Sequence, residues 1–206
     1  MATRSISKST LSRLPQYLEY LKTHAEDVPM YISAAAIAQA MGLGEVQVRK
    51  DLASVSNAGR PKVGYLVTQL VEELESFLGY DSKSHVIVVG TGRLGRALLE
   101  YEGFQSYGLE IVAGFDLYPP ENPPAKPIYA MHDLAVYCRE HQVEIGVLAV
   151  PTAVAQQVCD QMVKCGIRAI LNFAPVHLSA PAGVLIHNEN IAVSLAMLSE
   201  HLNQQF

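Results

Sequence analysis

The chain has 206 residues, of which half are apolar and 17% are charged, and its formal net charge at pH 7 is −5. This composition excludes disordered and coiled-coil chains, and the length fits one large domain or two small ones. No apolar run reaches the roughly 20 residues that a membrane span requires. The N-terminus is short and polar and lacks the apolar core of a signal peptide, so we expect a cytoplasmic protein without a membrane partner.

The charges are unevenly distributed along the chain. Residues 1–65 carry eight Lys and Arg against five Asp and Glu, whereas residues 66–206 carry seven against fifteen. A basic front part on an acidic remainder is expected when only the front part meets phosphates. The three cysteines, Cys138, Cys159 and Cys165, form no CxxC pair, which indicates reduced thiols in a cytoplasm. We expect small apolar side chains there, with a cysteine redox switch as the alternative.

An amphipathic helix is predicted near the start of the chain. Leu14, Leu18, Leu21 and Ala25 recur at helical spacing. Pro15 fits such a helix only in its first turn, where its missing N–H costs nothing.

A helix-turn-helix follows in the sequence. Ser33 is a good N-cap for a second helix, which ends at Gly42, and Gly44 precedes a third helix. Two helices joined by such a tight glycine-containing turn are typical of DNA-binding proteins. The segment 57–67 (NAGRPKVGYLV) then predicts a two-stranded wing, and an amphipathic helix after it ends at a polar hinge over residues 79–84. We therefore expect a winged helix-turn-helix domain over residues 1–80.

The third helix is predicted to enter the major groove, as the second helix of a helix-turn-helix does. Its apolar side holds Val48, Leu52 and Val55, and its opposite side is mostly polar. Arg49 and Lys50 could reach guanine O6 and N7 or phosphates. An ordinary solvated helix face is the alternative.

The wing carries Arg60 and Lys62 on either side of Pro61. A narrow A-tract minor groove attracts arginine, and Pro61 lowers the entropy cost of ordering the loop. We therefore expect an A/T-rich contact through Arg60 and Lys62.

From His85 onward, apolar strands alternate with helices, which is typical of a doubly wound parallel sheet. The expected strands cover residues 85–90, 109–116, 127–131, 144–150, 168–173 and 184–188. The expected helices cover residues 93–101, 132–141, 152–166 and 190–203. The fold class is therefore α/β, with a Rossmann domain over residues 81–206 behind the winged helix domain.

The first strand of this domain runs into a GxGxxG motif that opens a helix. Its residues are Gly90, Thr91, Gly92, Arg93, Leu94 and Gly95. Asp116 ends the next strand, 21 residues after Gly95, where an acidic residue accepts from the ribose hydroxyls of NAD(H). The helix N-terminus would hold the pyrophosphate. Together these features predict a site for NAD(H) rather than NADP(H), because Asp116 would repel a 2′-phosphate.

Catalytic groups are missing from the loops that would surround the nicotinamide. Val150-Pro151 and the segment Asn172, Phe173, Ala174 and Pro175 are largely apolar, and His177 is the one catalytic candidate nearby. No metal motif or catalytic triad occurs, so we expect neither a metal nor an enzyme. An apolar pocket favours the neutral ring of NADH over the charged ring of NAD⁺.

The chain resembles the Rex family of redox-sensing transcriptional repressors over nearly its full length. The motifs that carry the resemblance are LSRLPQYL, QVRKDLASVSNAGRPKVGY, VVGTGRLGRALLEYEGF, VPTAVAQQV and LNFAPVHL. The resemblance implies a homodimer that binds an inverted-repeat operator while NADH is low and releases it on binding NADH. It also implies that the C-terminal helix, from about residue 190, is exchanged between subunits.

The resemblance also implies functional residues. On the DNA side it points to Gln47, Arg49, Lys50, Arg60, Lys62 and Tyr65; Ser54 is added because it lies on the polar side of the same helix. On the cofactor side it adds Tyr101, Val150, Pro151 and Asn172 to Pro175 to the glycine motif and Asp116. The chain departs from many relatives at Asn190, where an aspartate is common, at Glu19, where a basic residue is common, and after Leu52, where many carry bulky aromatic residues.

Two other functions remain open from the sequence. An NAD-dependent dehydrogenase with a helical cap would use His177 as its base and would not bind DNA specifically. A CoA-binding domain would also use a glycine-rich first turn. Neither alternative needs the basic helix-turn-helix and wing.

Overall fold

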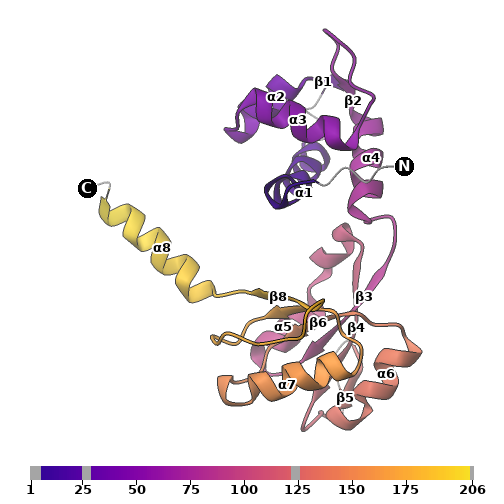
Figure 1. Ribbon diagram of the computed structural model, residues 1–206, viewed down its shortest axis with the longest axis vertical. Helices are drawn as coiled ribbons and strands as arrows, with labels where there is room; N and C mark the ends of the chain where they lie inside the picture. The colour runs from indigo at the N-terminus through magenta and orange to yellow at the C-terminus, as the bar shows by residue number, and fades with distance from the viewer. Residues whose placement is uncertain (1–5, 25–28, 122–125, 205–206) are drawn as a thin grey trace. The chain divides into compact units, whose positions relative to one another are not determined.

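The computed structural model describes residues 6–24, 29–121 and 126–204. It divides into two compact units, Met1–Ser82 and Lys83–Phe206, each described below by itself (Figure 1). The predicted Ala25 lies outside the described residues. In the described part of the chain, no helix is long and apolar enough to cross a membrane.

The first unit is a helical domain with one small sheet. Its helices are α1 (Lys8–Thr23), α2 (Ala34–Met41), α3 (Glu45–Val55) and α4 (Val67–Leu78). Its strands are β1 (Tyr31–Ile32) and β2 (Tyr65–Leu66), which pair in antiparallel. The core takes one apolar stripe from each helix, including Leu14, Ile37, Leu52, Leu70 and Leu74.

The two ends of α2 confirm the predicted N-cap at Ser33 and the predicted end at Gly42. The Ser33 hydroxyl accepts from the Ala36 N–H at 3.1 Å, and Gly42 leaves the helix with φ 64°. A serine side chain satisfies an otherwise unpaired N–H there, and glycine adopts the left-handed conformation without a steric penalty. The turn between α2 and α3 is therefore fixed by its own residues.

The expectation for Pro15 is wrong. Helix α1 is capped by Ser7, begins at Lys8 and contains Pro15 in its interior. The proline ring removes one backbone hydrogen bond, which normally weakens a helix. Helix α1 persists because Leu14, Tyr17 and Leu21 are fully buried against the core, so tertiary packing compensates for the local cost.

The wing is smaller than the predicted two-stranded hairpin. Arg60 and Gly64 exchange two backbone hydrogen bonds of 2.9 Å each, and this single bridge closes the loop. Strand β2 pairs with β1 instead, with Ile32 opposite Tyr65. A two-residue strand such as β1 is too short for its periodicity to be seen in a sequence.

The second unit is a parallel sheet of six strands in the order β5-β4-β3-β6-β7-β8. The strands are β3 (Ser84–Val89), β4 (Leu109–Asp116), β5 (Ile128–Ala130), β6 (Ile145–Leu148), β7 (Ala169–Asn172) and β8 (Leu185–Asn188). In chain order this is the 3-2-1-4-5-6 arrangement of a Rossmann fold, so the predicted fold class is confirmed. The order reverses between β3 and β6, and a ligand crevice is expected at the carboxyl ends of these strands.

Helices cover both faces of the sheet. Helix α5 (Arg93–Glu100) and the 3-10 turn η1 (Glu102–Tyr107) pack on one face. Helices α6 (Leu134–Glu140) and α7 (Thr152–Lys164) pack on the other, and the 3-10 turn η2 (Met131–Asp133) leads into α6. Strand β3 is buried from Val86 to Val89, as its continuous apolar sequence predicts.

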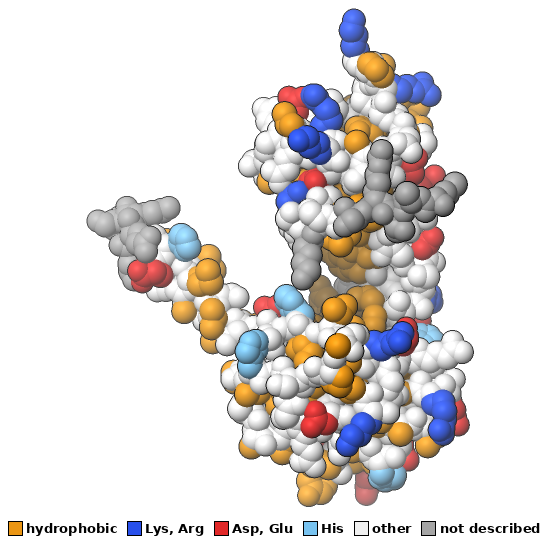
Figure 2. Space-filling view, viewed as in Figure 1, with side chains coloured by type: hydrophobic (Ala, Val, Ile, Leu, Met, Phe, Trp, Pro, Cys, Tyr) orange, Lys and Arg blue, Asp and Glu red, His pale blue; other side chains and the backbone are white. Residues whose placement is uncertain are grey.

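Within its own unit, helix α8 (Ile191–Gln204) makes little contact with the sheet and the helices that cover it. The described side chains of this helix are exposed, and its apolar residues Leu195, Leu198 and Leu202 remain 59–63% accessible. Figure 2 shows the apolar side chains of α8 gathered along the helix.

Candidate functional site

The glycine-rich turn between β3 and α5 is built for close backbone approach. Gly90 has φ 92°, and a Cβ there would collide with the carbonyl oxygen of Ala149. A Cβ at Gly95 would collide with the carbonyl oxygen of Gly90, so only glycine lets α5 pack this close to β3. Gly92 faces open space, which leaves room for a pyrophosphate at the start of α5.

Asp116 is tied to this turn at the end of β4. Its Oδ2 accepts from the Thr91 N–H at 2.7 Å and from the Thr91 hydroxyl at 3.0 Å, and its Oδ1 accepts from the Tyr118 N–H at 3.2 Å. Burial alone would raise the pKa of Asp116, but these hydrogen bonds to the ionised form outweigh it and lower the pKa. Asp116 is therefore held as a carboxylate beside the glycine motif.

A cavity of about 490 Å³ lies between the glycine-rich turn, the ends of β4 and β6, and α7. The predicted residues that line it are Gly90, Gly92, Arg93, Leu94, Asp116, Val150 and Pro151. Its further lining residues are mostly apolar and include Phe115, Leu117, Met131, Val154 and Val158. Arg93 and Asp116 are the two ionisable side chains among the residues described around it, so the walls are otherwise uncharged.

The sequence analysis missed the contribution of α7 and Met131. Val154, Gln157, Val158 and Gln161 all line the cavity from α7. Their spacing along the helix was available as a signal, because α7 starts directly after the predicted Val150-Pro151 turn.

The remaining predicted cofactor residues lie outside this cavity. Asn172 is fully buried and fully bonded: its oxygen accepts from the Ala174 N–H at 2.9 Å, and its amide donates to Ala174, Val176 and Asn188. It therefore shapes the loop that contains Phe173, Ala174 and Pro175. Tyr101 is 59% exposed at the far end of α5, where its ring meets Phe104 edge-on.

His177, the base that a dehydrogenase would need, does not line this cavity. Its Nδ1 lies 3.3 Å from the side-chain nitrogen of Asn188. Among the described residues, no group of three or more His, Cys, Asp or Glu side chains could hold a metal ion. Cys138 and Cys159 are buried, and burial raises the pKa of the Cys138 thiol to about 11.

In the first unit, α3 presents the predicted DNA-contacting residues on one exposed side. Gln47, Arg49 and Lys50 are exposed. Val46, which precedes them on α3, is 62% exposed. Arg49 forms an ion pair with Glu45 one turn earlier, and the half-buried Ser54 donates to the Asp51 carbonyl. Figure 2 shows Lys and Arg side chains gathered on this unit.

The wing residues divide into two groups. Arg60 and Lys62 are exposed at the tip, and Lys62 adopts φ 66° in the tight loop. Tyr65 is only 7% exposed, and its ring lies so close to Gly59 that a Cβ there would be 2.8 Å from it. The pKa of Tyr65 is raised above its ordinary value, and burial of the ring is the largest cause. Tyr65 therefore supports the wing from the core rather than reaching out from it.

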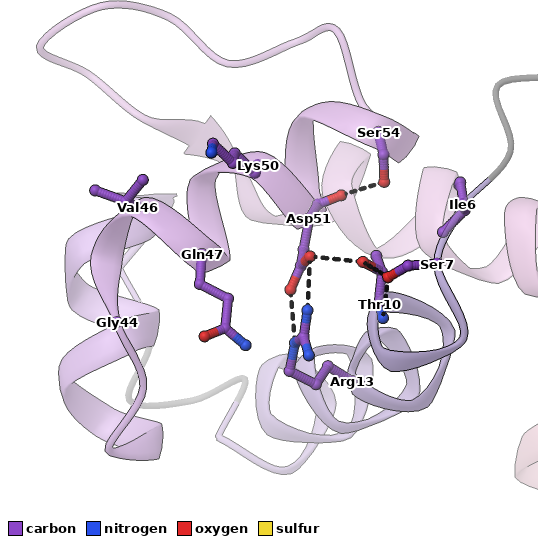
Figure 3. A pocket seen from close by; sticks show the side chains of 10 residues that line it. All are labelled: Ile6, Ser7, Thr10, Arg13, Gly44, Val46, Gln47, Lys50, Asp51 and Ser54. Atoms are coloured by element: carbon purple, nitrogen blue, oxygen red, sulfur yellow. Dashed lines mark hydrogen bonds and ion pairs between the residues drawn. The ribbon is translucent and has the colours of Figure 1, made fainter.

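A buried carboxylate that the sequence analysis missed joins α1 to α3 (Figure 3). Asp51 is 4% exposed and accepts from Arg13 Nε at 2.8 Å, Arg13 Nη2 at 2.9 Å, Tyr17 Oη at 2.8 Å and Thr10 Oγ1 at 3.0 Å. Burial alone would raise the pKa of Asp51, but the bonds from Arg13, Tyr17 and Thr10 lower it. A groove of about 790 Å³ runs past this network, and Gln47 and Lys50 line it.

Family models match both parts of the chain. The model described as putative DNA-binding protein N-terminus matches residues 5–53, and the CoA binding domain model matches residues 81–176. The redox-sensing transcriptional repressor Rex of Porphyromonas gingivalis is 39% identical over 196 residues, covering 94% of this chain and 90% of its own length. Its counterpart from Treponema denticola is 37% identical over 199 residues, covering 94% of each chain.

The chain belongs to the Rex family of redox-sensing transcriptional repressors. Members of this family are repressors and not enzymes, although they share the Rossmann fold with dehydrogenases. A crystal structure of the Rex-family repressor RSP in complex with β-NAD⁺ and operator DNA matches with a TM-score of 0.90 at 29% identity, covering 98% of this chain and 94% of RSP. RSP in complex with β-NADH matches with a TM-score of 0.86, also at 29% identity, covering 98% of this chain and 96% of RSP.

Proposed function

We propose that this Rex-family member binds operator DNA through α3 and the wing while NADH is low, and releases the DNA when NADH occupies the cavity of the second unit. The observation that carries this proposal is that one chain combines a DNA-binding element with a cofactor crevice. One unit holds an exposed helix-turn-helix with cationic side chains on α3 and on the wing. The other holds a crevice whose described lining contains Arg93 and Asp116 as its ionisable side chains and no histidine. Such a crevice can bind a nicotinamide cofactor as a signal rather than as a reactant.

In the first unit, the proposed DNA contacts are Gln47, Arg49, Lys50 and Ser54 on α3, with Arg60 and Lys62 on the wing. The exposed α3 side chains would read the major groove. The wing would insert its cations into a narrow, A/T-rich minor groove. We assign Tyr65 a supporting role, because its ring is packed into the core beneath the loop.

In the second unit, the proposed cofactor contacts start from the glycine motif and Asp116. The N–H groups at the start of α5 would hold the pyrophosphate, and the Asp116 carboxylate would accept from the ribose hydroxyls. Val150 and Pro151 would line the nicotinamide end. Asn172 would act indirectly by shaping the loop that follows β7. Tyr101 lies outside the cavity of its own chain, so it would reach a cofactor only across a dimer contact.

The apolar walls give a reason for redox selectivity. Enclosing the charged ring of NAD⁺ without a counter-charge is unfavourable, whereas the ring of NADH is neutral. Each tenfold preference corresponds to about 1.4 kcal/mol, and reversing a two-state equilibrium from 1:99 to 99:1 takes about 5.5 kcal/mol. Two cofactor sites in a homodimer could share that requirement.

We further propose that α8 joins two subunits and that the dimer works in the cytoplasm. The exposed stripe of Leu195, Leu198 and Leu202 has no partner among the described residues of its own chain. Exchange of this helix would bury the stripe, and a two-fold dimer suits an inverted-repeat operator.

The test is a titration of NADH into the full-length protein bound to an A/T-rich palindrome. We expect NADH to release the duplex, and NAD⁺ to compete for the site without releasing it. Retention of the duplex at saturating NADH, or release by NAD⁺ alone, would contradict the proposal.

A further inference from the structure

The side chain of Gln47 does not project freely from α3. Its amide lies against the guanidinium of Arg13 on α1, in the groove drawn in Figure 3. Two donors cannot bond to each other, so the oxygen of Gln47 is the atom that faces Arg13, although Figure 3 draws the nitrogen there. In this orientation the oxygen lies 3.1 Å from Arg13 Nη1 and 2.9 Å from Arg13 Nε. Nη1 is the donor that remains for it, because the single Nε hydrogen already bonds Asp51.

Arg13 is itself held in place. Nε and Nη2 of Arg13 donate to the two carboxylate oxygens of Asp51, which is 4% exposed. The side chain of Arg13 is only 18% exposed. A bidentate pair to a buried carboxylate fixes the plane of a guanidinium as well as its position. The donor to the Gln47 oxygen is thus anchored to the core and does not depend on a mobile surface side chain.

This anchoring changes what Gln47 can recognise. A free glutamine reads adenine with both ends of its amide, since the oxygen accepts from N6 and the nitrogen donates to N7. Because the oxygen is turned toward Arg13 and accepts from it, it is not presented to adenine N6. The exposed nitrogen still offers two N–H donors, which match the acceptors N7 and O6 of guanine.

We propose that Arg13 is a positioning residue that sets base specificity, because it holds the Gln47 oxygen and leaves Gln47 to read guanine rather than adenine. This inference rests on the proposed function, since it requires α3 to enter the major groove. It adds a residue of α1 to the determinants of sequence preference.

The experiment compares base preferences in the full-length protein. A duplex is first selected from a randomised pool, and each operator position is then tested with all four bases. The position that Gln47 reads is the one where Gln47→Ala abolishes discrimination. At this position we expect the unmodified protein to favour guanine over adenine.

Removing Arg13 should shift this ratio. The double variant Arg13→Met, Asp51→Asn removes the guanidinium without leaving a buried unpaired carboxylate, and the new amide oxygen can still accept from Tyr17 and Thr10. We expect the guanine-to-adenine ratio to move toward adenine by about fivefold or more, the lower end of the discrimination that a good bidentate contact provides. The shift should vanish when Gln47→Ala is added, because Arg13 acts through Gln47.

A matched control separates this effect from the loss of a positive charge. Arg60→Ala also removes one cation, so overall affinity should fall while the ratio at the Gln47 position stays constant. If the double variant fails to melt cooperatively or to bind NADH, Arg13→Met alone takes its place. Asp51 then keeps its bonds from Tyr17 and Thr10, while Gln47 loses its donor, so the same shift is expected.

An unchanged ratio without Arg13, or a shift that persists in the Gln47→Ala background, would overturn the inference. These outcomes are distinct from failure of the proposed function. In that case the unmodified protein would select no sequence from the pool, or NADH would not release the selected duplex.

Discussion

At the scale of single residues, two carboxylates act in different ways. Asp116 is half-buried and holds the glycine-rich turn while facing the cavity, so it can exchange one of its present bonds for a ribose hydroxyl. Asp51 is buried with four hydrogen bonds from three side chains and is not available to a ligand. The first carboxylate is the one that we propose binds the cofactor, and the second fixes α1 against α3.

The Asp116→Arg substitution should weaken NADH binding and reverse the preference against NADPH. The new cation cannot accept from the ribose hydroxyls but attracts a 2′-phosphate. We expect at least a tenfold loss in NADH affinity by calorimetry, or about 1.4 kcal/mol. Glu140→Arg makes the same charge change at the end of α6, away from the cavity, and should leave the affinity unaltered. Equal NADH affinity in both variants would remove Asp116 from the site.

The stability of the first unit should depend on pH through Asp51. The pKa of Asp51 is lowered below its ordinary value of 3.8, so its contribution is complete above that value and is lost as the pH falls through the lower folded pKa. Asp51→Asn should therefore reduce the free energy of unfolding by about 3 kcal/mol at pH about 5, and by about 1 kcal/mol less than that at pH about 3. Denaturant midpoints followed by circular dichroism measure this difference. A gap that is independent of pH would contradict the assignment.

At the scale of elements, our proposals assign recognition of DNA to the wing and recognition of a second subunit to α8. The wing is closed by one backbone bridge, Pro61 restricts the backbone of its loop at one residue, and the buried ring of Tyr65 supports its base. Helix α8 is the opposite case. It is regular, but nothing among the described residues of its own chain covers its apolar side.

Replacing Arg60 with alanine should remove the preference for A·T pairs beside the half-sites. The narrow minor groove of an A-tract attracts this side chain more than an average groove does. We also expect the salt dependence of operator binding to become shallower by about one phosphate contact, as measured by gel shift over a range of salt concentrations. Arg139→Ala, on α6 of the other unit, serves as the control. An unaltered A·T preference would show that the wing does not read the minor groove.

Charges on the apolar stripe of α8 should separate the subunits. Leu195→Glu with Leu198→Glu would place two carboxylates where apolar area is buried in a dimer, at a cost of several kcal/mol. We expect a monomer by light scattering and a large loss of operator affinity, because one half-site remains per molecule. Ala196→Glu adds a charge away from the stripe and should remain dimeric. A dimeric double variant would mean that α8 is not the dimer contact.

At the scale of the whole molecule, the proposed function is a coupling between two units of one chain. Residues 1–65 carry an excess of Lys and Arg, and residues 66–206 carry an excess of Asp and Glu. The binding free energies of NADH and DNA can therefore be measured separately and compared. Any coupling between them must be reciprocal.

Operator DNA should lower the affinity for NADH by the same factor by which NADH lowers the affinity for DNA. The two factors follow from calorimetric titration of NADH with and without a saturating duplex, and from DNA titration with and without NADH. We expect a factor of between about 5 and 150, the usual range of such couplings. A factor of one in the NADH titration would exclude the proposed switch, even if both ligands bind.

Much of this architecture could be predicted from local sequence patterns. Ser33 and Gly42 set the ends of α2, and the glycine motif and Asp116 line the same cavity, as their spacing predicts. These features can be predicted from sequence because each depends on a few neighbouring residues and on backbone conformations that glycine alone adopts easily. The alternation of apolar strands and helices then determined the α/β class.

Only the tertiary structure decided which polar groups are buried and which are available. Arg13 and Asp51 lie 38 residues apart, and their pairing depends on how α1 packs against α3. The same holds for the burial of Tyr65 and Asn172, the pairing of β1 with β2, and the tolerance of Pro15 inside α1. The physical reason is that burial and hydrogen-bond partners arise from long-range packing, whereas periodicity and turn conformation are properties of the local chain.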